Sequence, residues 1–401
     1  MSRMNRSKKQ APLSDLILKF QFLQACCQVE HTRDDITFIS SYLESSALEN
    51  LPIYAMQHGL LPLLYTSLKK IIETHHLFTA TSLLETLKKY YLFYVQNNML
   101  MTTQLLQTMK LLEENGYQAL SFKGPSLAIK AYGDITLRQY VDLDILVKEE
   151  DAFEVATLLK RDGATSEQNL SLLTKSTCLN SAKDFSLFKN QVHTELHWRL
   201  FEKKYNIPLV QCVSKVACQT VVINQQSIYT LEDETLLVYL CLHGAKHTFE
   251  RLEWVCDIDR FIRNTNIDWH HAFSIATQAH SKRAFLLGLS LSKTLFHTPL
   301  PQFVEQEKVG QSIEELQHFV LERLTNTKSS PSSFKRNYEI FRFQSKLFDS
   351  KKQAILFNLS TFFKISTTDC QTFNLPNNLK FLYFPLRPLR LITRYLSNLF
   401  R

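Results

Sequence analysis

Residues 141–147, Val-Asp-Leu-Asp-Ile-Leu-Val, constrain the fold of this chain more than any other segment. The apolar side chains from Val141 to Val147 alternate with Asp142 and Asp144, which predicts a β-strand with one face in the core. Residues i and i+2 of a strand point to the same side, so the two carboxylates share a face. Neighbouring carboxylates repel each other unless a cation lies between them. Their oxygen atoms suit a divalent metal ion such as Mg²⁺.

The segment before this strand has the features of a phosphate site. Residues 118–122 predict a short strand, and Gly124 then allows a tight turn. Pro125 suits the first turn of a helix over residues 126–132, whose free backbone N–H groups favour an anion. The side chains that can add donors are those of Lys123, Ser126 and Arg138. Phosphate donors facing a carboxylate pair are what metal-assisted nucleotidyl transfer requires.

These residues resemble a known family. Lys123-Gly124, the downstream Arg138 and Asp142-Leu-Asp144 are similar to the "KG…R…DxD" core of the uncharacterised nucleotidyltransferase family. That family belongs to the DNA polymerase beta-like superfamily, and abortive-infection nucleotidyltransferase toxins carry a similar core. Lys123-Gly124-Pro125-Ser126 stands here in place of the superfamily's usual Gly-Ser pair. This departure concerns the residues that would contact the triphosphate. It does not affect Asp142 and Asp144, which the resemblance implies are the metal-binding pair.

A second acidic strand is predicted further along. Residues 184–199 predict a β-hairpin that turns near residues 189–191, with Glu195 and His197 on one face of its second strand. The run Thr194-Glu-Leu-His-Trp198 resembles the family's acidic-x-His-Trp strand, where the superfamily places its third carboxylate. The resemblance implies that Glu195 is the third metal ligand and the general base, and that His197 lies beside the substrate. The alternative is a solvent-exposed Glu195 on an edge strand.

Three further segments also resemble the family. They are residues 51–65, which contain a His-Gly-x-x-Pro-Leu run starting at His58, and residues 231–247 and 252–260. A single histidine beside a glycine turn is more often a structural cap than a functional group. A capping role is therefore the favoured interpretation of His58.

Two motifs in the later helical part have spacings that resemble those of metal sites. His243 and His247 are spaced as i and i+4, but the run lacks the glutamate of a metalloprotease, so packing or substrate contact is favoured over zinc binding. Asp257 and Asp259 form a second Asp-x-Asp. On a helix, residues two apart point about 200° apart, so this pair cannot chelate one ion. Only one of the two aspartates can face the site.

The composition indicates a folded, helix-rich protein. Of 401 residues, 45% are hydrophobic and 21% are charged, which is typical of a globular chain, and only 8 are glycine. A net charge of +8 suits a phosphate-bearing substrate, nucleic acid or an anionic membrane. The eight cysteines lack Cys-x-x-Cys spacing, which favours free thiols in a reducing compartment. With no signal peptide or spanning segment evident, the sequence predicts a cytoplasmic protein.

The predicted fold is α+β and helix-rich, with a small mixed β-sheet nucleotidyltransferase core flanked by N- and C-terminal helical regions. The predicted segments are a disordered leader at 1–12, an N-terminal helical region at 13–112, the α/β core at 113–225, a helical region at 226–324, a linker at 325–333 and a basic helical tail at 334–401.

The end of the tail, residues 379–401, is basic and contains no acidic residue. After Pro388 it predicts a helix on which Leu389 and Ile392 belong to an apolar stripe, with the arginines off that stripe. A basic amphipathic helix of this kind can contact an anionic membrane surface. The alternative is that the stripe packs on the protein's own helical region.

The residues and the resemblance together predict a metal-dependent nucleotidyltransferase. It would move a nucleoside monophosphate from an NTP to an acceptor hydroxyl and release pyrophosphate. Asp142, Asp144 and Glu195 would hold two Mg²⁺ ions, with Mn²⁺ as the alternative metal. The acceptor stays open among a small molecule, a glycan, RNA and a protein. The alternative function is a non-catalytic module on the same fold that binds nucleotide or RNA.

Overall fold

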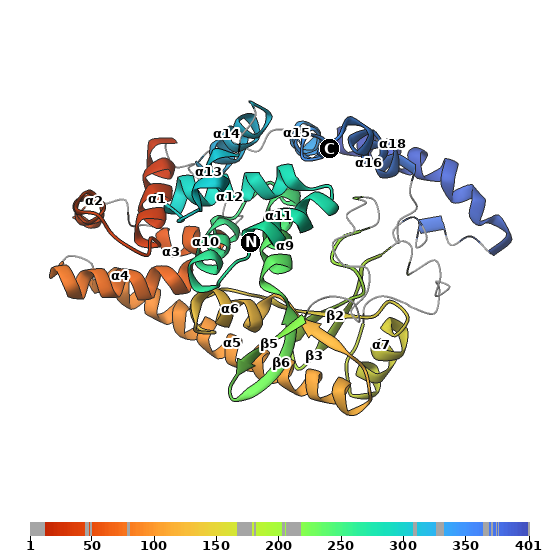
Figure 1. Cartoon of the computed structure of the whole chain (residues 1–401), viewed down its shortest axis with the longest axis horizontal. Coiled ribbons are helices and arrows are strands. Elements are labelled where there is room, and N and C mark those ends of the chain that lie inside the picture. Colours follow the sequence, from red (N-terminus) through yellow and green to blue (C-terminus); the bar gives the residue numbers. More distant parts are fainter. Residues whose placement is uncertain are drawn as a thin grey trace, which may run out of the picture.

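The computed structural model describes residues 13–44, 48, 50–77, 81–166, 179, 182–202, 205, 218–307, 311–325, 333–363, 369, 372–373, 375 and 377–399. The predicted leader at 1–12 lies outside these residues, as does most of the predicted linker at 325–333. Within them, a small mixed sheet lies among many helices (Figure 1). This arrangement confirms the predicted α+β, helix-rich fold class.

The N-terminal region is helical, as predicted. Its helices are α1 (Leu13–Cys26), α2 (Arg33–Glu44), α3 (Leu51–Gln57), α4 (Leu61–His75) and α5 (Thr81–Glu114). The long helix α5 runs along the lower edge of the molecule in Figure 1. Its inner side buries Met101, Leu105 and Leu112 in the same hydrophobic core as Leu143 and Ile145 of the sheet. Helix α5 therefore supports the sheet from below.

The sheet contains four strands connected in a mixed topology. The elements are β1 (Ala119–Ser121), α6 (Gly124–Tyr132), β2 (Asp142–Val147), α7 (Ala152–Arg161), β3 (Asp184–Lys189) and β4 (Val192–His197). The strand order is β1-β2-β4-β3, with β2 parallel to β4 and the outer strands antiparallel to their neighbours. The acidic strand β2 thus lies in the middle of the sheet, beside the strand that carries Glu195.

The predicted position of Val141 on the core face of the strand is wrong. The alternating pattern placed Val141 on the core face, but Val141 is 63% exposed and precedes β2. The pairing of β2 with β4 begins at Asp142, so no neighbouring strand fixes the side chain of Val141 on the core side. From Leu143 onward, both faces of β2 are buried, because helices cover the sheet on both sides.

The predicted boundary of the core at residue 225 falls at the turn of a hairpin. A second antiparallel pair, β5 (Cys218–Ile223) and β6 (Gln226–Leu231), continues across it. Asn224 and Gln225 form the turn with φ angles of 47° and 64°. Because this turn lacks glycine, no local motif in the sequence marks it as a hairpin. The helical region predicted from 226 therefore starts with a strand.

The helices after β6 form the upper part of the molecule. They are α9 (Asp233–Lys246), α10 (Leu252–Asn264), α11 (Trp269–Gln278), α12 (Lys282–Phe296), α13 (Gln302–Gln306) and α14 (Gln311–Thr325). Helices α9, α10 and α12 pack on one another and share a core with α1, α3 and α4. The N-terminal and later helical regions therefore form one continuous hydrophobic core.

The C-terminal helices lie at the upper right of Figure 1. They are α15 (Ser333–Lys346), α16 (Lys351–Phe363), the 3₁₀ helix η4 (Asn377–Leu382) and α18 (Tyr383–Leu399). The prediction that the last helix starts after Pro388 is wrong, because α18 begins at Tyr383 and includes Pro388. Among the described residues, no helix is both long enough and apolar enough to cross a bilayer.

Candidate active site

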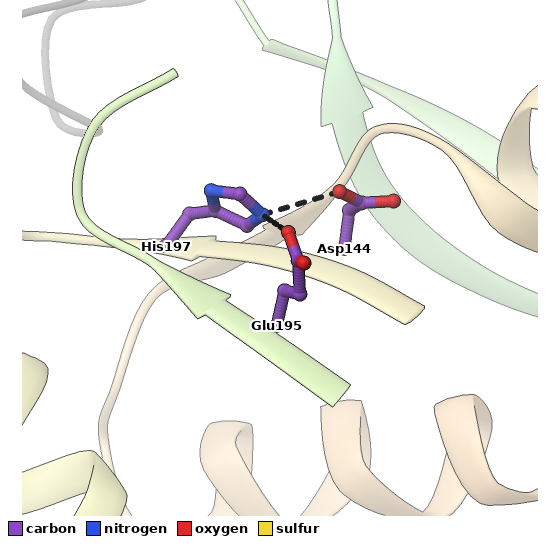
Figure 2. Close-up of side chains that lie close together, drawn as sticks. All are labelled: Asp144, Glu195 and His197. Atoms are coloured by element: carbon purple, nitrogen blue, oxygen red, sulfur yellow. Dashed lines mark hydrogen bonds and ion pairs between the residues drawn. The ribbon is translucent and has the colours of Figure 1, made fainter. Parts of the chain in front are cut away.

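The register between β2 and β4 assembles the centre of the site. Asp144 is the pairing partner of Glu195, and Leu146 is the partner of His197. Partners on neighbouring strands point to the same face, so Asp144 and Glu195 meet there. The ligand atoms of Asp144, Glu195 and His197 all lie within 4.8 Å of one another (Figure 2). The structure therefore brings Glu195 and His197 together with Asp144 of the first acidic strand.

His197 connects the two carboxylates. Its Nε2 lies 3.1 Å from Asp144 Oδ1 and 3.1 Å from Glu195 Oε2. Burial and the nearby Lys183 act to lower the pKa of His197, but its hydrogen bonds to the two carboxylates outweigh them and raise this pKa. The hydrogen bond from His197 is also the largest influence on Glu195, whose pKa is lowered to about 2. His197 thus holds both carboxylates ionised and in place.

Lys123 approaches the same carboxylate from the turn before α6. Gly124 follows it with a φ of 53°, a left-handed conformation that glycine adopts without strain. Lys123 Nζ lies 3.0 Å from Asp144 Oδ1; the Asp144 side chain is buried and that of Lys123 is 14% exposed. Burial alone would raise the pKa of Asp144, but Lys123 and His197 outweigh it and hold this pKa well below its usual range. At the centre of the site, the negative charge of Asp144 is therefore balanced by Lys123 and His197.

Asp142 lines the same cavity but lies outside the cluster of three ligand atoms. Its pKa is raised, first by burial and then by the negative charge of Asp144. The two aspartates therefore differ, although they share one strand face. Asp144 is neutralised by neighbouring cations, whereas Asp142 carries the uncompensated part of the negative charge.

The cluster has the donor set that a hard divalent cation requires. Asp144 Oδ2 is buried and accepts no hydrogen bond from the described residues. Carboxylate oxygens of Asp144 and Glu195 lie within reach of one ion, and Asp142 adds a third carboxylate to the cavity. Mg²⁺ is bound in proteins by oxygen ligands of this kind. The residues therefore fit a site for a divalent metal ion.

A cavity of about 330 Å³ opens over these carboxylates. Lys183, which the sequence analysis did not single out, lines it and lies 3.3 Å from Glu195 Oε2 and 3.4 Å from His197 Nδ1. No motif distinguishes Lys183, since it follows the segment rich in serine and threonine before β3. The helices α9 and α10 close the cavity with Tyr239, His243 and Trp254.

Two of the three predicted phosphate donors are engaged elsewhere. Ser126 is fully buried, donates to Ser121 Oγ at 2.7 Å and does not line the cavity. Arg138 lines the cavity, but its Nε and Nη2 both donate to the Asp257 carboxylate at 2.9 Å. Tyr132 donates to the same carboxylate at 2.8 Å. Ser126 and Arg138 are therefore both engaged with other protein groups, and of the two only Arg138 lines the cavity.

The two aspartates of the second Asp-x-Asp motif point in different directions, as the angle between residues two apart on a helix predicts. Asp257 lines the cavity and binds Arg138. Asp259 points away and accepts hydrogen bonds from Arg263 Nε at 2.8 Å and from the Thr298 hydroxyl at 2.7 Å. This pair therefore anchors the helix α10 on two sides and does not bind one ion together.

The histidines of α9 pack into an aromatic wall. The rings of His243 and His247 lie 4.8 Å apart, and both contact Trp254, at 5.6 and 5.5 Å. Burial, followed by nearby lysines, lowers the pKa of His247 to about 4 and that of His243 well below its usual range. Both rings are therefore neutral at pH 7, and among the described residues neither belongs to a metal-binding cluster. The packing role favoured from the sequence agrees with this arrangement.

His58 and Gly59 fix the start of α10. His58 Nδ1 accepts the Leu252 N–H at 3.3 Å, and its carbonyl oxygen accepts the Glu253 N–H at 3.1 Å. Gly59 has a φ of 73°, and a Cβ at this position would lie 1.4 Å from the Glu253 carboxylate. The His-Gly pair is therefore structural, as predicted. It satisfies helix N–H groups and leaves room for a buried glutamate of the cavity wall.

We expect Gly59→Ala to destabilise the protein and to displace Glu253. A side chain at positive φ costs about 1 kcal/mol, and the clash with Glu253 adds to it. Chemical denaturation should show a loss of roughly 2 kcal/mol or more. Gly133→Ala is the matched control, since Gly133 has the same φ of 73° but no neighbour within 4 Å of a Cβ. Equal losses in the two variants would mean that Glu253 does not set the requirement at Gly59.

The family model described as uncharacterised nucleotidyltransferase matches residues 45–297. No curated protein matches the chain. One similar solved structure is the antibiotic-resistance factor ANT(2'')-Ia, with 11% identity over 48% of this chain and 96% of that chain, and a TM-score of 0.32.

A second similar structure is an antigenic nucleotidyltransferase-like protein from Paracoccidioides brasiliensis. It has 13% identity over 49% of this chain and 91% of that chain, with a TM-score of 0.31. The family match, unlike these distant similarities, covers more than half of the chain and includes the whole carboxylate cluster. On this match, the chain belongs to the uncharacterised nucleotidyltransferase family.

Proposed function

We propose that this nucleotidyltransferase requires Mg²⁺ or Mn²⁺ and transfers a nucleoside monophosphate from an NTP to an acceptor hydroxyl, releasing pyrophosphate. The observation that carries the proposal is the in-register pairing of Asp144 with Glu195, which leaves Asp144 Oδ2 buried and without a hydrogen bond from the described residues. Asp144, Glu195 and Asp142 would hold the metal. A bound divalent ion would stabilise charge on the phosphoryl oxygens and activate the hydroxyl.

The residues around the carboxylates would hold the triphosphate. Lys123 and Lys183 both line the cavity and lie within 3.5 Å of a carboxylate of the cluster. Positive groups fixed beside a reacting phosphate stabilise the charge that develops during transfer. His197 would keep Asp144 and Glu195 ionised and correctly oriented while substrate binds.

The aromatic wall of His243, His247 and Trp254 would hold the base of the nucleotide. These rings line the same cavity as the carboxylates, and both histidines are neutral at pH 7. Stacking of a base on an aromatic ring contributes about 1–3 kcal/mol and depends little on the identity of the base. The wall would therefore bind the nucleoside without choosing among the four NTPs by hydrogen bonding.

The function is tested by incubating the purified protein with each of four labelled NTPs and a cell extract. The expected result is a labelled macromolecule or small molecule that forms with Mg²⁺ and not with a chelator. Nucleotide binding by the protein without label transfer to any component of the extract would favour the non-catalytic alternative. Label transfer in the presence of chelator would remove the metal from the mechanism.

We expect Lys123→Ala to weaken NTP binding and to leave metal binding unchanged or stronger. Lys123 competes with a metal ion for Asp144 but attracts the triphosphate, so its removal affects the two ligands in opposite directions. Titration calorimetry with Mg²⁺ alone and with NTP separates the two effects. Lys130→Ala is the matched control, since Lys130 is on the helix α6 that follows Lys123 but pairs with Asp233 away from the cavity. A parallel loss of both affinities in Lys123→Ala would contradict the assignment.

The peripheral contact of residues 379–401 with an anionic membrane remains part of the proposal. The apolar residues Leu389 and Ile392 of the stripe on α18 are 57% and 54% exposed, although α18 packs on α16. Arg387 and Arg390 both pair with the buried Asp369, so part of the basic charge is already neutralised. The apolar face would therefore contribute more to binding than the charge.

Sedimentation with anionic vesicles tests this contact. We expect the full-length protein to co-sediment and the variant Leu389→Glu to remain in the supernatant, because a charge on the stripe opposes its insertion into lipid. Val222→Glu is the matched control, since Val222 is 60% exposed on the distant hairpin. If the full-length protein fails to co-sediment at low salt, the stripe is not a membrane contact.

A further inference from the structure

The outer side of α5 is unusual for a solvent-facing helix. Residues 90–109, between Lys89 and Lys110, contain no charged side chain. A surface helix ordinarily carries charged residues on the face opposite the core. Here the outward positions include Leu92, Phe93 and Met99, which are 48%, 63% and 54% exposed. The middle of the helix, which runs along the lower edge of the molecule in Figure 1, is therefore uncharged and exposes several large apolar side chains.

Four exposed apolar residues of this segment are placed symmetrically about Gln96, which is itself exposed. Leu92 and Phe93 precede it by four and three positions, and Met99 and Leu100 follow it by three and four. Residues three and four apart share one side of a helix, so all five lie on a single stripe. The stripe therefore has apolar side chains at equivalent positions on both sides of Gln96.

A two-fold symmetric contact needs a surface of this kind. In an isologous dimer the same patch is used by both copies, and it must complement itself. An antiparallel pair of α5 helices crossing at Gln96 would place Leu92 against the partner's Leu100 and Phe93 against the partner's Met99. The two Gln96 side chains would meet at the axis, where each amide can donate to the other.

The other occupants of an apolar surface fit this stripe less well. Nucleic acid and anionic lipid are both attracted by clusters of lysine and arginine, and residues 90–109 contain none. A charged protein surface would find no charged side chain on the stripe to pair with. A second copy of the same uncharged surface requires no charge complementarity at all.

We infer that α5 is a homodimer interface, in which the stripe Leu92, Phe93, Gln96, Met99 and Leu100 packs antiparallel on the same stripe of a second copy. The uncharged part of α5 is roughly 30 Å long, and a stable interface buries about 800 Å² on each partner. A contact made by a single helix pair is small on that scale, so we expect a weak dimer that depends on protein concentration. The carboxylate cluster is on the opposite face of the sheet from α5, so both sites would stay open.

Charge substitutions test both the contact and its direction. Sedimentation velocity of the full chain over a range of concentrations should show a monomer–dimer equilibrium. Leu92→Glu or Leu100→Lys alone should weaken association by about thirtyfold or more, the loss typical of a hot-spot residue. The double variant should associate more tightly than either single variant, because each introduced glutamate then faces the partner's introduced lysine. Ile53→Lys, at a residue 47% exposed on α3, is the control and should dimerise normally.

Cross-linking tests the position of the axis. Gln96→Cys should form a disulfide-linked dimer on mild oxidation, because the two positions meet at the crossing point. Gln107→Cys should not, since the two copies of that position would lie roughly 30 Å apart along the helices. The wild-type chain under the same oxidant accounts for its native thiols. A sedimentation coefficient that does not change with concentration, or a dimer that Leu92→Glu leaves intact, would overturn the inference.

Discussion

Asp144→Asn is expected to remove both the activity and a substantial part of the stability of this protein. The side chain is 1% exposed and holds Lys123 at 3.0 Å and His197 at 3.1 Å. Removing one member of a buried ion pair leaves the other charge without compensation and costs about 3–5 kcal/mol. The loss of a charged group next to the reacting phosphate should lower kcat by about 10²–10³-fold or more.

Asp142→Asn is the matched comparison, because it neutralises the neighbouring carboxylate on the same strand face. Burial and the charge of Asp144 raise the pKa of Asp142, so its negative charge is unfavourable in the folded state without metal. Its neutralisation should therefore leave stability unchanged or slightly increased, while transfer is lost. The sequence alone treats the two aspartates as one repelling pair, and the structure separates them.

Urea denaturation in the absence of metal and label transfer in its presence distinguish the two variants. We expect a lower midpoint for Asp144→Asn only, and loss of transfer for both. Equal midpoints would show that Lys123 and His197 do not depend on the Asp144 charge. Retained transfer by Asp142→Asn would remove Asp142 from the mechanism.

Arg138→Ala is expected to act mainly on the fold rather than on the substrate. The side chains of Arg138 and Asp257 are 7% and 1% exposed and are joined by two hydrogen bonds of 2.9 Å. Truncation of the arginine should therefore cost about 3–5 kcal/mol, because the buried Asp257 charge would keep only the hydrogen bond from Tyr132 and no cation. Asp257→Ala should cost a similar amount by leaving the guanidinium unpaired.

A double-mutant cycle gives the decisive measurement. Because the two single variants each leave one buried charge, the double variant should be much less destabilised than the sum of the two. NTP affinity of the folded Arg138→Ala protein should fall less than that of Lys123→Ala. Full stability in Arg138→Ala together with a large loss of NTP affinity would restore the role of Arg138 as a phosphate donor.

Several features of the fold and the site could be predicted from the sequence because they depend on neighbouring residues. The period-two pattern of Asp142–Val147 specifies a strand, and the same period places Glu195 and His197 on one face of β4. The resemblance to the family implies that the acidic residues of these two strands belong to one site. The helical angle likewise separates Asp257 from Asp259 without reference to the rest of the chain.

The tertiary structure alone decided which of these groups meet and which are neutralised. The partner of Arg138 is 119 residues away, on a helix whose position depends on the core shared by α6 and α10. Ser126 faces Ser121 because the turn at Gly124 brings α6 back on β1. Lys183 reaches Glu195 only through the pairing of β3 with β4. Local periodicity fixes the direction of a side chain along its own element, whereas its partner, its burial and its charge are set by the packing of elements that are distant in sequence.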